Sequence, residues 1–247
     1  MTEPQRTTVR DGLLVVDDVT VQRGGRAVAE GITISVPAGE VTTLLGPNGA
    51  GKSSTAAAIA GLARVAAGSI KVDGTDITNR RPDRVRAAGV SVVPEGRRLL
   101  TDLSVEDNLK VATFSLGRAA ASDGVAYALS LFPELEKRWK IGGRLLSGGE
   151  QQMVVLAQAL VSKPKVLVVD ELSLGLAPVV VKRLVPVLTE VASSGVAVLL
   201  IEQFAHIALS LATDAYVLES GRVRYSGTAK ELNDNPELLH SAYLLRD

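Results

Sequence analysis

A glycine-rich stretch between an apolar run and a helix-forming run constrains this chain more than any other feature. The apolar run is 41–45, the helix-forming run is 55–60, and the stretch reads Gly46, Pro47, Asn48, Gly49, Ala50, Gly51, Lys52, Ser53, Ser54. It meets the spacing G-x-x-x-x-G-K-[ST] in full. Glycines let backbone N–H groups turn inward around a phosphate chain, and the helix N-terminus adds donors and a favourable dipole. The stretch predicts a nucleoside triphosphate site.

Two side chains of this stretch carry its chemistry. Lys52 is expected to reach the β- and γ-phosphates, and the Ser53 hydroxyl to ligate Mg²⁺. An ordinary strand–turn–helix, in which the glycines serve only the turn, leaves the Lys-Ser pair unexplained.

The composition indicates a folded protein whose main partner is not nucleic acid. Lysine plus arginine number 27, as do aspartate plus glutamate, so no basic excess is available to neutralise phosphates. Hydrophobic residues make up 46% of the chain, enough for a substantial core. The chain has no cysteine, which excludes disulfides and fits a reducing compartment.

The sequence predicts neither a signal peptide nor a membrane span. Residues 1–12 are polar with mixed charge, and apolar runs such as 196–201 are far too short to cross a bilayer. We expect a cytosolic protein that other subunits must hold if it works at a membrane.

The order of the patterns predicts an α/β fold, a phosphate-loop NTPase core with a mainly parallel sheet. Alternation at 13–21 and 32–36, joined by the segment 22–31, predicts antiparallel strands. Further strands are expected at 69–72, 90–93, 166–169 and 196–201, with two short ones about the turn 220–221.

Residues 95–146 change from strand to helix patterns and predict a helical insertion. Ser104 to Asp107 resembles a capping box with Asp in place of Glu, opening a helix to about residue 114. Helical runs also fit 124–131 and 134–140, and an earlier short helix fits 82–88. The expected division of a single domain is 13–36 and 66–76 as an antiparallel β subdomain, 37–65, 77–94 and 147–220 as the core, 95–146 as the helical subdomain and 221–247 as a C-terminal extension.

Asp170 and Glu171 follow the apolar strand 166–169. Ligands bind at the C-terminal ends of parallel strands, so both carboxylates are expected beside the phosphate loop. Asp170 is the candidate for holding Mg²⁺, and Glu171 for orienting or deprotonating the water that attacks the γ-phosphate.

Ser147, Gly148 and Gly149 precede a long helix expected at 150–161 and form a second anion-binding pattern. In isolation an ordinary Ser N-cap with a Gly-Gly turn explains them. Two phosphate-binding edges in one chain nevertheless suggest two copies, with each nucleotide lying between the loop of one and this segment of the other.

The segments 46–54, 146–152 and 168–171 together resemble the ATP-binding cassette (ABC) ATPases, over nearly the whole chain. The resemblance implies ATP as the nucleotide and a dimer that powers transport through membrane permease subunits, supplied indirectly by an extracytoplasmic solute-binding protein. It also implies a place at the cytoplasmic face of the membrane. The segments 93–98, 103–109, 173–178, 200–203 and 216–221 resemble the cassettes for branched-chain and other hydrophobic amino-acid uptake, whose close relatives serve urea and amides.

Four residues depart from the general family pattern. Glu95 stands where most members have a Gln that senses Mg²⁺ and the γ-phosphate, and Gln203 stands at the switch histidine; the amino-acid subfamily shares both. His206, three residues later, is expected on a helix surface. Arg23 replaces the aromatic residue that stacks on adenine, where its guanidinium offers a cation–π contact. Leu172 replaces a proline and is expected to loosen the turn that follows.

The resemblance also implies a docking site for the membrane subunit at 95–103, although Leu99 and Leu100 are equally explained as core residues. Two other functions stay open: a soluble cassette ATPase without a transporter, and a regulatory nucleotide-binding module with little turnover. The partner cassette is either an identical chain or a sister chain.

Overall fold

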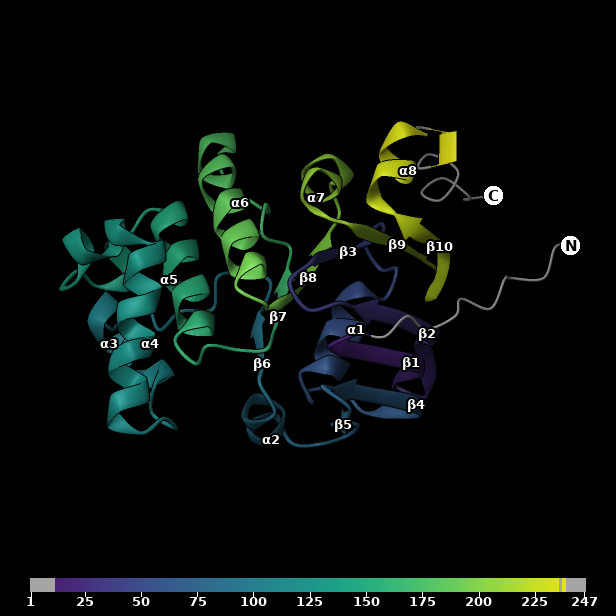
Figure 1. Ribbon diagram of the computed structural model, residues 1–247, viewed down its shortest axis with the longest axis horizontal. Helices are drawn as coiled ribbons and strands as arrows, with labels where there is room; N and C mark the ends of the chain where they lie inside the picture. The colour runs from purple at the N-terminus through teal and green to yellow at the C-terminus, as the bar shows by residue number, and fades with distance from the viewer. Residues whose placement is uncertain (1–11, 236, 239–247) are drawn as a thin grey trace, which may run out of the picture.

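Two β-sheets with helices between and around them organise the computed structural model (Figure 1). The structure describes residues 12–235 and 237–238. The polar N-terminal stretch and the last part of the expected C-terminal extension lie outside the described residues.

The first sheet is antiparallel, with strand order β2-β1-β4-β5. Its strands are β1 (Leu14–Arg23), β2 (Arg26–Val36), β4 (Val65–Val72) and β5 (Thr75–Asp76). The expected link 22–31 is wrong: the chain turns at Gly24 and Gly25, where φ is positive, and most of that segment is strand. The strand expected at 69–72 begins earlier, because Val65 pairs with Val21 of β1.

The second sheet has the order β10-β9-β3-β8-β7-β6, with parallel pairing from β6 to β9 and an antiparallel β10 at one edge. Its strands are β3 (Val41–Leu45), β6 (Val90–Val93), β7 (Val166–Asp170), β8 (Ala197–Glu202), β9 (Asp214–Glu219) and β10 (Arg222–Thr228). The predicted mainly parallel α/β core is confirmed.

Each face of this second sheet packs into its own hydrophobic core. Val166 and Val168 of β7 face a core shared with the antiparallel sheet and α1 (Lys52–Ile59), which lies between the two sheets. Leu167 and Val169 face the opposite core. The helices packed there are α5 (Gly148–Leu160), α6 (Pro178–Ser193), α7 (Ala205–Leu211) and α8 (Ala229–Asp234). Burial on both faces explains the unbroken apolar runs in the sequence.

The helical region at the left of Figure 1 joins β6 to α5. It contains α3 (Val105–Ala112), α4 (Arg118–Leu131) and the 3-10 helices η1 (Pro133–Arg138) and η2 (Gly143–Leu145), while α2 (Pro82–Ala87) precedes β6. Ser104 caps α3 as predicted: its Oγ accepts from the Asp107 N–H at 3.1 Å. The run expected as a helix at 134–140 is instead the shorter and tighter η1.

Candidate functional site

The predicted phosphate loop connects the end of β3 to the start of α1. Gly51, the N-cap of α1, has a φ of 104°, and Gly46 has a φ of 155°. A Cβ at Gly51 would lie 2.5 Å from the carbonyl oxygen of Val28, and one at Gly46 would overlap the carbonyl oxygen of Leu218. Only glycine fits at these two positions, so the loop backbone lies tightly against both sheets.

The ammonium group of Lys52 lies inside this loop. Its Nζ donates to the carbonyl oxygens of Gly46 at 2.9 Å and Pro47 at 3.2 Å, and it lies 3.8 Å from a carboxylate oxygen of Glu171. The side chain is 4% exposed. Phosphate oxygens are stronger acceptors for an ammonium than neutral carbonyls, so the arrangement can exchange these bonds for a phosphate chain.

Asp170 ends β7 beside the loop and is nearly buried. The Ser53 hydroxyl donates to its carboxylate, but Oδ1 has no hydrogen-bond partner among the described residues. Burial raises the pKa of Asp170 to about 6; the charges of Glu171 and Glu95 add to the rise, while Ser53 and Lys52 oppose it. A buried carboxylate oxygen without a donor is a position at which a cation is favourable.

The donor set at this position fits Mg²⁺. Ser53, Asp170 and Glu95 supply hard oxygen ligands of the kind that Mg²⁺ prefers. In the described part of the chain, no three His, Cys, Asp or Glu side chains lie close enough to hold a metal by themselves. Nucleotide sites bind Mg²⁺ through one or two carboxylates together with phosphate oxygens and water. Such a site therefore requires fewer ligands from the protein than a site built from protein side chains alone.

Glu171 has an unusual backbone conformation. Its φ is 52°, in the left-handed region that residues with a Cβ seldom occupy. Its N–H donates to the carbonyl oxygen of Ile201 at 2.9 Å, which extends the pairing of β7 with β8 by one residue and holds the strained conformation. Its carboxylate lies beside Lys52.

A cleft of about 460 Å³ brings most of the predicted nucleotide residues together. It is lined by Arg23, Val28, Asn48, Gly49, Gly51, Lys52, Ser53, Ser54, Glu95, Glu171, Leu174 and Gln203. Asp170 does not line the cleft but is bonded to Ser53, which does. The sequence does not predict Val28 or Leu174 as site residues, because Val28 falls in the expected link 22–31 and an apolar residue carries no chemical signal of its own.

A buried carboxylate next to Gln203 holds the segment that follows Glu171. Glu202 is 1% exposed and accepts from the backbone N–H of Ser173 at 3.0 Å and from its hydroxyl at 2.9 Å. Burial raises the pKa of Glu202, against the bonds from Ser173 that lower it. No motif in the sequence marks Glu202, although it stands in the segment 200–203.

Ser147, Gly148 and Gly149 do not line the cleft. They begin α5, where Ser147 Oγ accepts from the Glu150 N–H at 3.3 Å and a Glu150 carboxylate oxygen accepts from the Ser147 N–H at 2.8 Å, a complete capping box. Ser147 itself is exposed. A Cβ at Gly148 would overlap the guanidinium of Arg97, so this glycine allows Arg97 to lie against the start of α5.

The stretch expected to dock a membrane subunit, 95–103, is partly core. Leu99 is 8% exposed and belongs to the hydrophobic core, whereas Leu100 is 47% exposed. The core explanation therefore holds for the first leucine and not for the second.

Comparison with known proteins identifies the family. The family model described as ABC transporter matches residues 29–173. The chain is 38% identical over 94% of its length to 99% of the high-affinity branched-chain amino acid transport ATP-binding protein BraG of Pseudomonas aeruginosa. It is 37% identical over 78% of its length to 82% of the probable branched-chain amino acid transport ATP-binding protein LivF of Archaeoglobus fulgidus. The chain belongs to the ABC transporter family.

Structural comparison agrees with this assignment of the fold. The crystal structure of the ADP conformation of an ATP-binding cassette of an ABC transporter superposes with a TM-score of 0.85 at 23% identity, over 96% of this chain and all of the other. As a member of the family, this chain is an ATP-binding subunit of a transporter and hydrolyses ATP. Membrane permease subunits are the partners that such a subunit requires. No helix in the described residues has both the length and the apolar character needed to span a bilayer.

Two departures from the ABC pattern take definite places in the structure. Arg23 is exposed at the end of β1 and lines the cleft. Leu172 is 1% exposed and packs in the core beneath the segment that Glu202 holds, so in place of the family's proline it contributes a buried apolar contact. His206 is exposed on α7, as expected.

Proposed function

We propose that this chain hydrolyses ATP at the interface of a head-to-tail dimer and thereby drives the uptake of branched-chain or other hydrophobic amino acids. The identity to BraG over nearly the full length of both chains supports this class of solute. The finer sequence segments that resemble the amino-acid subfamily point to the same class of solute.

The loop 46–54 binds the phosphate chain of ATP in this proposal. Its backbone N–H groups and the N-terminus of α1 supply donors, and Lys52 exchanges the carbonyls of Gly46 and Pro47 for phosphate oxygens. Arg23 lines the same cleft, and in this proposal its guanidinium covers the adenine face.

Ser53, Asp170 and Glu95 would hold Mg²⁺, which neutralises charge on the phosphate oxygens when bound. Glu171 accepts a proton from the attacking water, and its strained backbone keeps the carboxylate at the mouth of the loop. The Gln203 amide positions the γ-phosphate through a hydrogen bond without itself carrying a proton.

The observation that carries the dimer proposal is the separation of the two phosphate-binding edges. One copy gathers the loop, Glu171 and Gln203 at one cleft, yet leaves Ser147 exposed at the start of α5 outside that cleft. A second copy placed head to tail would bring its Ser147, Gly148 and Gly149 over the γ-phosphate. The second copy is an identical or a sister chain.

The partners proposed for this dimer are permease subunits in the membrane, with an extracytoplasmic solute-binding protein acting through them. The dimer then lies at the cytoplasmic face of the membrane, held by those subunits. The balanced charge of the chain argues against nucleic acid as a partner.

Uptake of radiolabelled leucine tests this function. Cells lacking the gene are complemented with the wild-type protein or with Lys52→Ala, and succinate uptake serves as the control for general energisation. We expect the wild-type protein alone to restore leucine uptake, and both strains to take up succinate equally. Undiminished uptake of leucine, isoleucine, valine and phenylalanine in the deletion strain would assign the transporter to another solute.

A further inference from the structure

Glu202 is a buried carboxylate that the proposed mechanism does not use. It ends β8, which lies between β3 and β7, the strands that lead to the phosphate loop and to Asp170. Glu202 is in register with Leu45 at the end of β3, so it stands at the edge of the sheet where ligands of parallel strands bind. It is 1% exposed and does not line the nucleotide cleft, although the next residue, Gln203, does.

Three donors from two segments converge on this carboxylate. The Ser173 N–H donates to Oε1 at 3.0 Å, and the Ser173 hydroxyl donates to Oε2 at 2.9 Å. The backbone N–H of Gln203 donates to the same carboxylate. Hydrogen bonds to an ionised acceptor are stronger than those between neutral groups. Glu202 therefore joins the segment that follows Glu171 to the backbone of Gln203.

Glu202 has no counter-ion in the described part of the chain, where none of the ion pairs of Lys and Arg includes it. Burial raises the pKa of Glu202 and the charge of Glu171 adds to the rise, while the bonds from Ser173 and Gln203 oppose it. A carboxylate without a cation is costly to bury unless hydrogen bonds satisfy its oxygens. The fold therefore holds this charge through the donors of the two segments.

The bonds to Glu202 restrain the conformation of Glu171. Glu171 has a left-handed backbone, and such strain persists only where several contacts fix it. Before it in the chain lies β7, and its own N–H is bonded to Ile201. After it, the N–H of Leu174 reaches the Glu171 carbonyl only at 3.4 Å. The shorter bonds from Ser173 to Glu202 are thus the firmer anchor on that side.

We propose that Glu202 is a positioning residue for ATP hydrolysis, which fixes Glu171 and Gln203 relative to each other by holding Ser173 and the Gln203 N–H on one carboxylate. Glu171 and Gln203 then keep the separation at which the attacking water faces the γ-phosphate. The inference rests on the proposed roles of Glu171 and Gln203 in hydrolysis. Glu202 acts through these neighbours and not on the nucleotide, because it does not line the cleft.

Steady-state ATP hydrolysis by the full-length chain tests this role. Glu202→Ala removes the acceptor of all three donors and should lower kcat at least about 30-fold, since small displacements of catalytic groups have large effects on rate. KM for ATP should change less than about threefold, because Lys52 and the loop are untouched.

Glu219→Gln is the matched control for loss of a buried carboxylate. Glu219 ends β9 and is 6% exposed, but it pairs with Arg224 and does not line the cleft. This variant should keep kcat within about twofold of the wild type.

Two further variants separate the reach of the side chain from its charge. Glu202→Gln has the same length, and its amide accepts from the Ser173 N–H while donating to the Ser173 hydroxyl. Glu202→Asp keeps the charge but is one methylene shorter, so it loses its reach to Ser173. We expect kcat to fall less than about tenfold for Glu202→Gln and as far as in Glu202→Ala for Glu202→Asp. The reverse order would assign the effect to the charge and would contradict the inference.

A double-mutant cycle tests the pairing of Ser173 with Glu202. Ser173→Ala removes the hydroxyl donor and should lower kcat about three- to tenfold. In Glu202→Ala the same change should have no further effect, because the acceptor is already gone.

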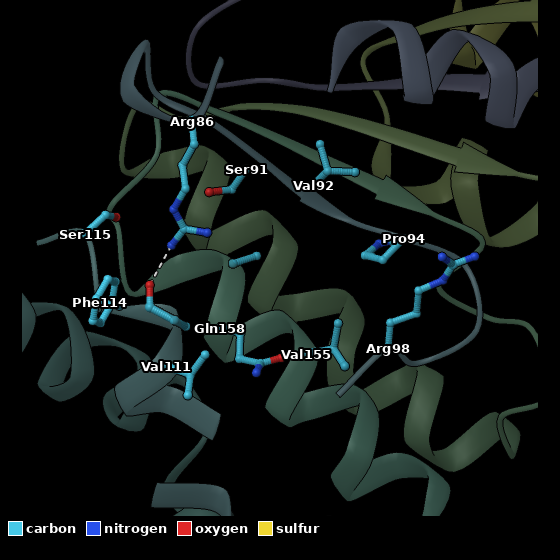
Figure 2. Close-up of a pocket in the computed structure, with 12 residues that line it drawn as sticks. Arg86, Ser91, Val92, Pro94, Arg98, Val111, Phe114, Ser115, Val155 and Gln158 are labelled. Atoms are coloured by element: carbon cyan, nitrogen blue, oxygen red, sulfur yellow. Dashed lines mark hydrogen bonds between the residues drawn. The ribbon is translucent and has the colours of Figure 1, made fainter. Parts of the chain in front are cut away.

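Ser91→Ala is the control for loss of a buried hydroxyl bond. Ser91 lies on β6 at the groove of about 430 Å³ between α2, the end of α3 and α5 (Figure 2), and its Oγ is 3.0 Å from that of Ser162. It does not line the nucleotide cleft, so kcat should stay within about twofold of the wild type.

Hydrogen–deuterium exchange gives a readout that does not depend on turnover. Without nucleotide, amides in the segment 172–176 should exchange at least about tenfold faster in Glu202→Ala than in the wild type. Glu219→Gln should leave their exchange unchanged. Thermal unfolding midpoints establish that each variant is folded, and if Glu202→Ala is not, Glu202→Asp and Ser173→Ala provide the same comparison.

Wild-type kcat in Glu202→Ala, or additive effects in the double mutant, would overturn the positioning role. Glu171→Gln distinguishes this failure from failure of the proposed mechanism. If Glu171→Gln is inactive while Glu202→Ala hydrolyses ATP at the wild-type rate, only the inference about Glu202 is wrong. Wild-type turnover in Glu171→Gln would remove the base from the mechanism and the positioning role with it.

Discussion

Asp170 and Glu171 are neighbours in the sequence but occupy different environments. Asp170 is nearly buried, with Oδ1 lacking a hydrogen-bond partner in the described part of the chain. Glu171 faces the cleft from a left-handed backbone and lies beside Lys52. Without bound nucleotide, the buried carboxylate of Asp170 destabilises the fold, whereas the carboxylate of Glu171 has the Lys52 ammonium within reach.

Asp170→Asn is therefore expected to stabilise the nucleotide-free protein at alkaline pH. The folded-state pKa of about 6 lies above the ordinary value of 3.8. Protonation of Asp170 stabilises the fold. This stabilisation is fully present below the ordinary pKa of 3.8 and is lost as the pH rises through the folded-state pKa of about 6. Above it the charged carboxylate costs on the order of 2–3 kcal/mol.

Urea unfolding in EDTA at pH 8 and pH 4 measures this effect. The variant should exceed the wild type in unfolding free energy by about 1–3 kcal/mol at pH 8, and the difference should fall below about 1 kcal/mol at pH 4. A variant less stable than the wild type at pH 8 would show that Asp170 supports the fold as well as the site. ATP hydrolysis should be lost in either case.

At the scale of elements, α4 and α5 approach each other closely at one glycine. A Cβ at Gly124, in the middle of α4, would overlap the carbonyl oxygen of Val161 at the end of α5. Alanine in a helix interior normally stabilises by about 1 kcal/mol relative to glycine. Here the clash with backbone, which cannot rotate away, costs about 1–3 kcal/mol.

Gly124→Ala is accordingly expected to lower the free energy of unfolding by up to about 2 kcal/mol, against the helix propensity. Ala126→Gly, at an exposed position of the same helix, measures the change in unfolding free energy that helix propensity alone produces. A more stable Gly124→Ala variant would mean that the two helices separate easily. The free energy from chemical denaturation decides the sign.

The elements show where sequence reasoning succeeds and where it fails. The strands of the parallel sheet were predicted within a residue or two, because burial on both faces leaves unbroken apolar runs. β4 begins at Val65 although 66–68 reads Ala-Ala-Gly, since pairing with β1 overrides weak strand propensity. Gly31 belongs to the expected link 22–31, but β2 continues through its positive φ with a shift of register.

The candidate site was predictable in part, at the residues whose chemical functions stand at fixed spacings in the sequence. Lys52, Ser53 and Glu171 have chemical functions that fixed spacings reveal, and the structure gathers them at one cleft. The roles of Glu202 and Leu172 depend on which residues pack against them in the fold, and a single sequence does not reveal those contacts.

At the scale of the whole molecule, the nucleotide cleft lies between the two sheets. The antiparallel sheet contributes Arg23 from β1 and Val28 from β2, and the parallel sheet contributes the loop and Glu171. The helical region places Ser147 elsewhere, at the start of α5. We propose that the second copy completes each site, so hydrolysis requires two chains although one chain contains every residue type involved.

Mixing two inactive variants measures this requirement most directly. Lys52→Ala removes the phosphate lysine, and Ser147→Arg blocks the start of α5; each homodimer then has a lesion in both of its sites. In a mixed head-to-tail dimer both lesions fall in one site and the other is intact. Random mixing makes half of the dimers mixed, so ATPase activity should return to roughly a quarter of the wild-type rate. Activity that stays at the average of the two separate variants would show that lysine and serine act within the same chain, and would contradict the shared site.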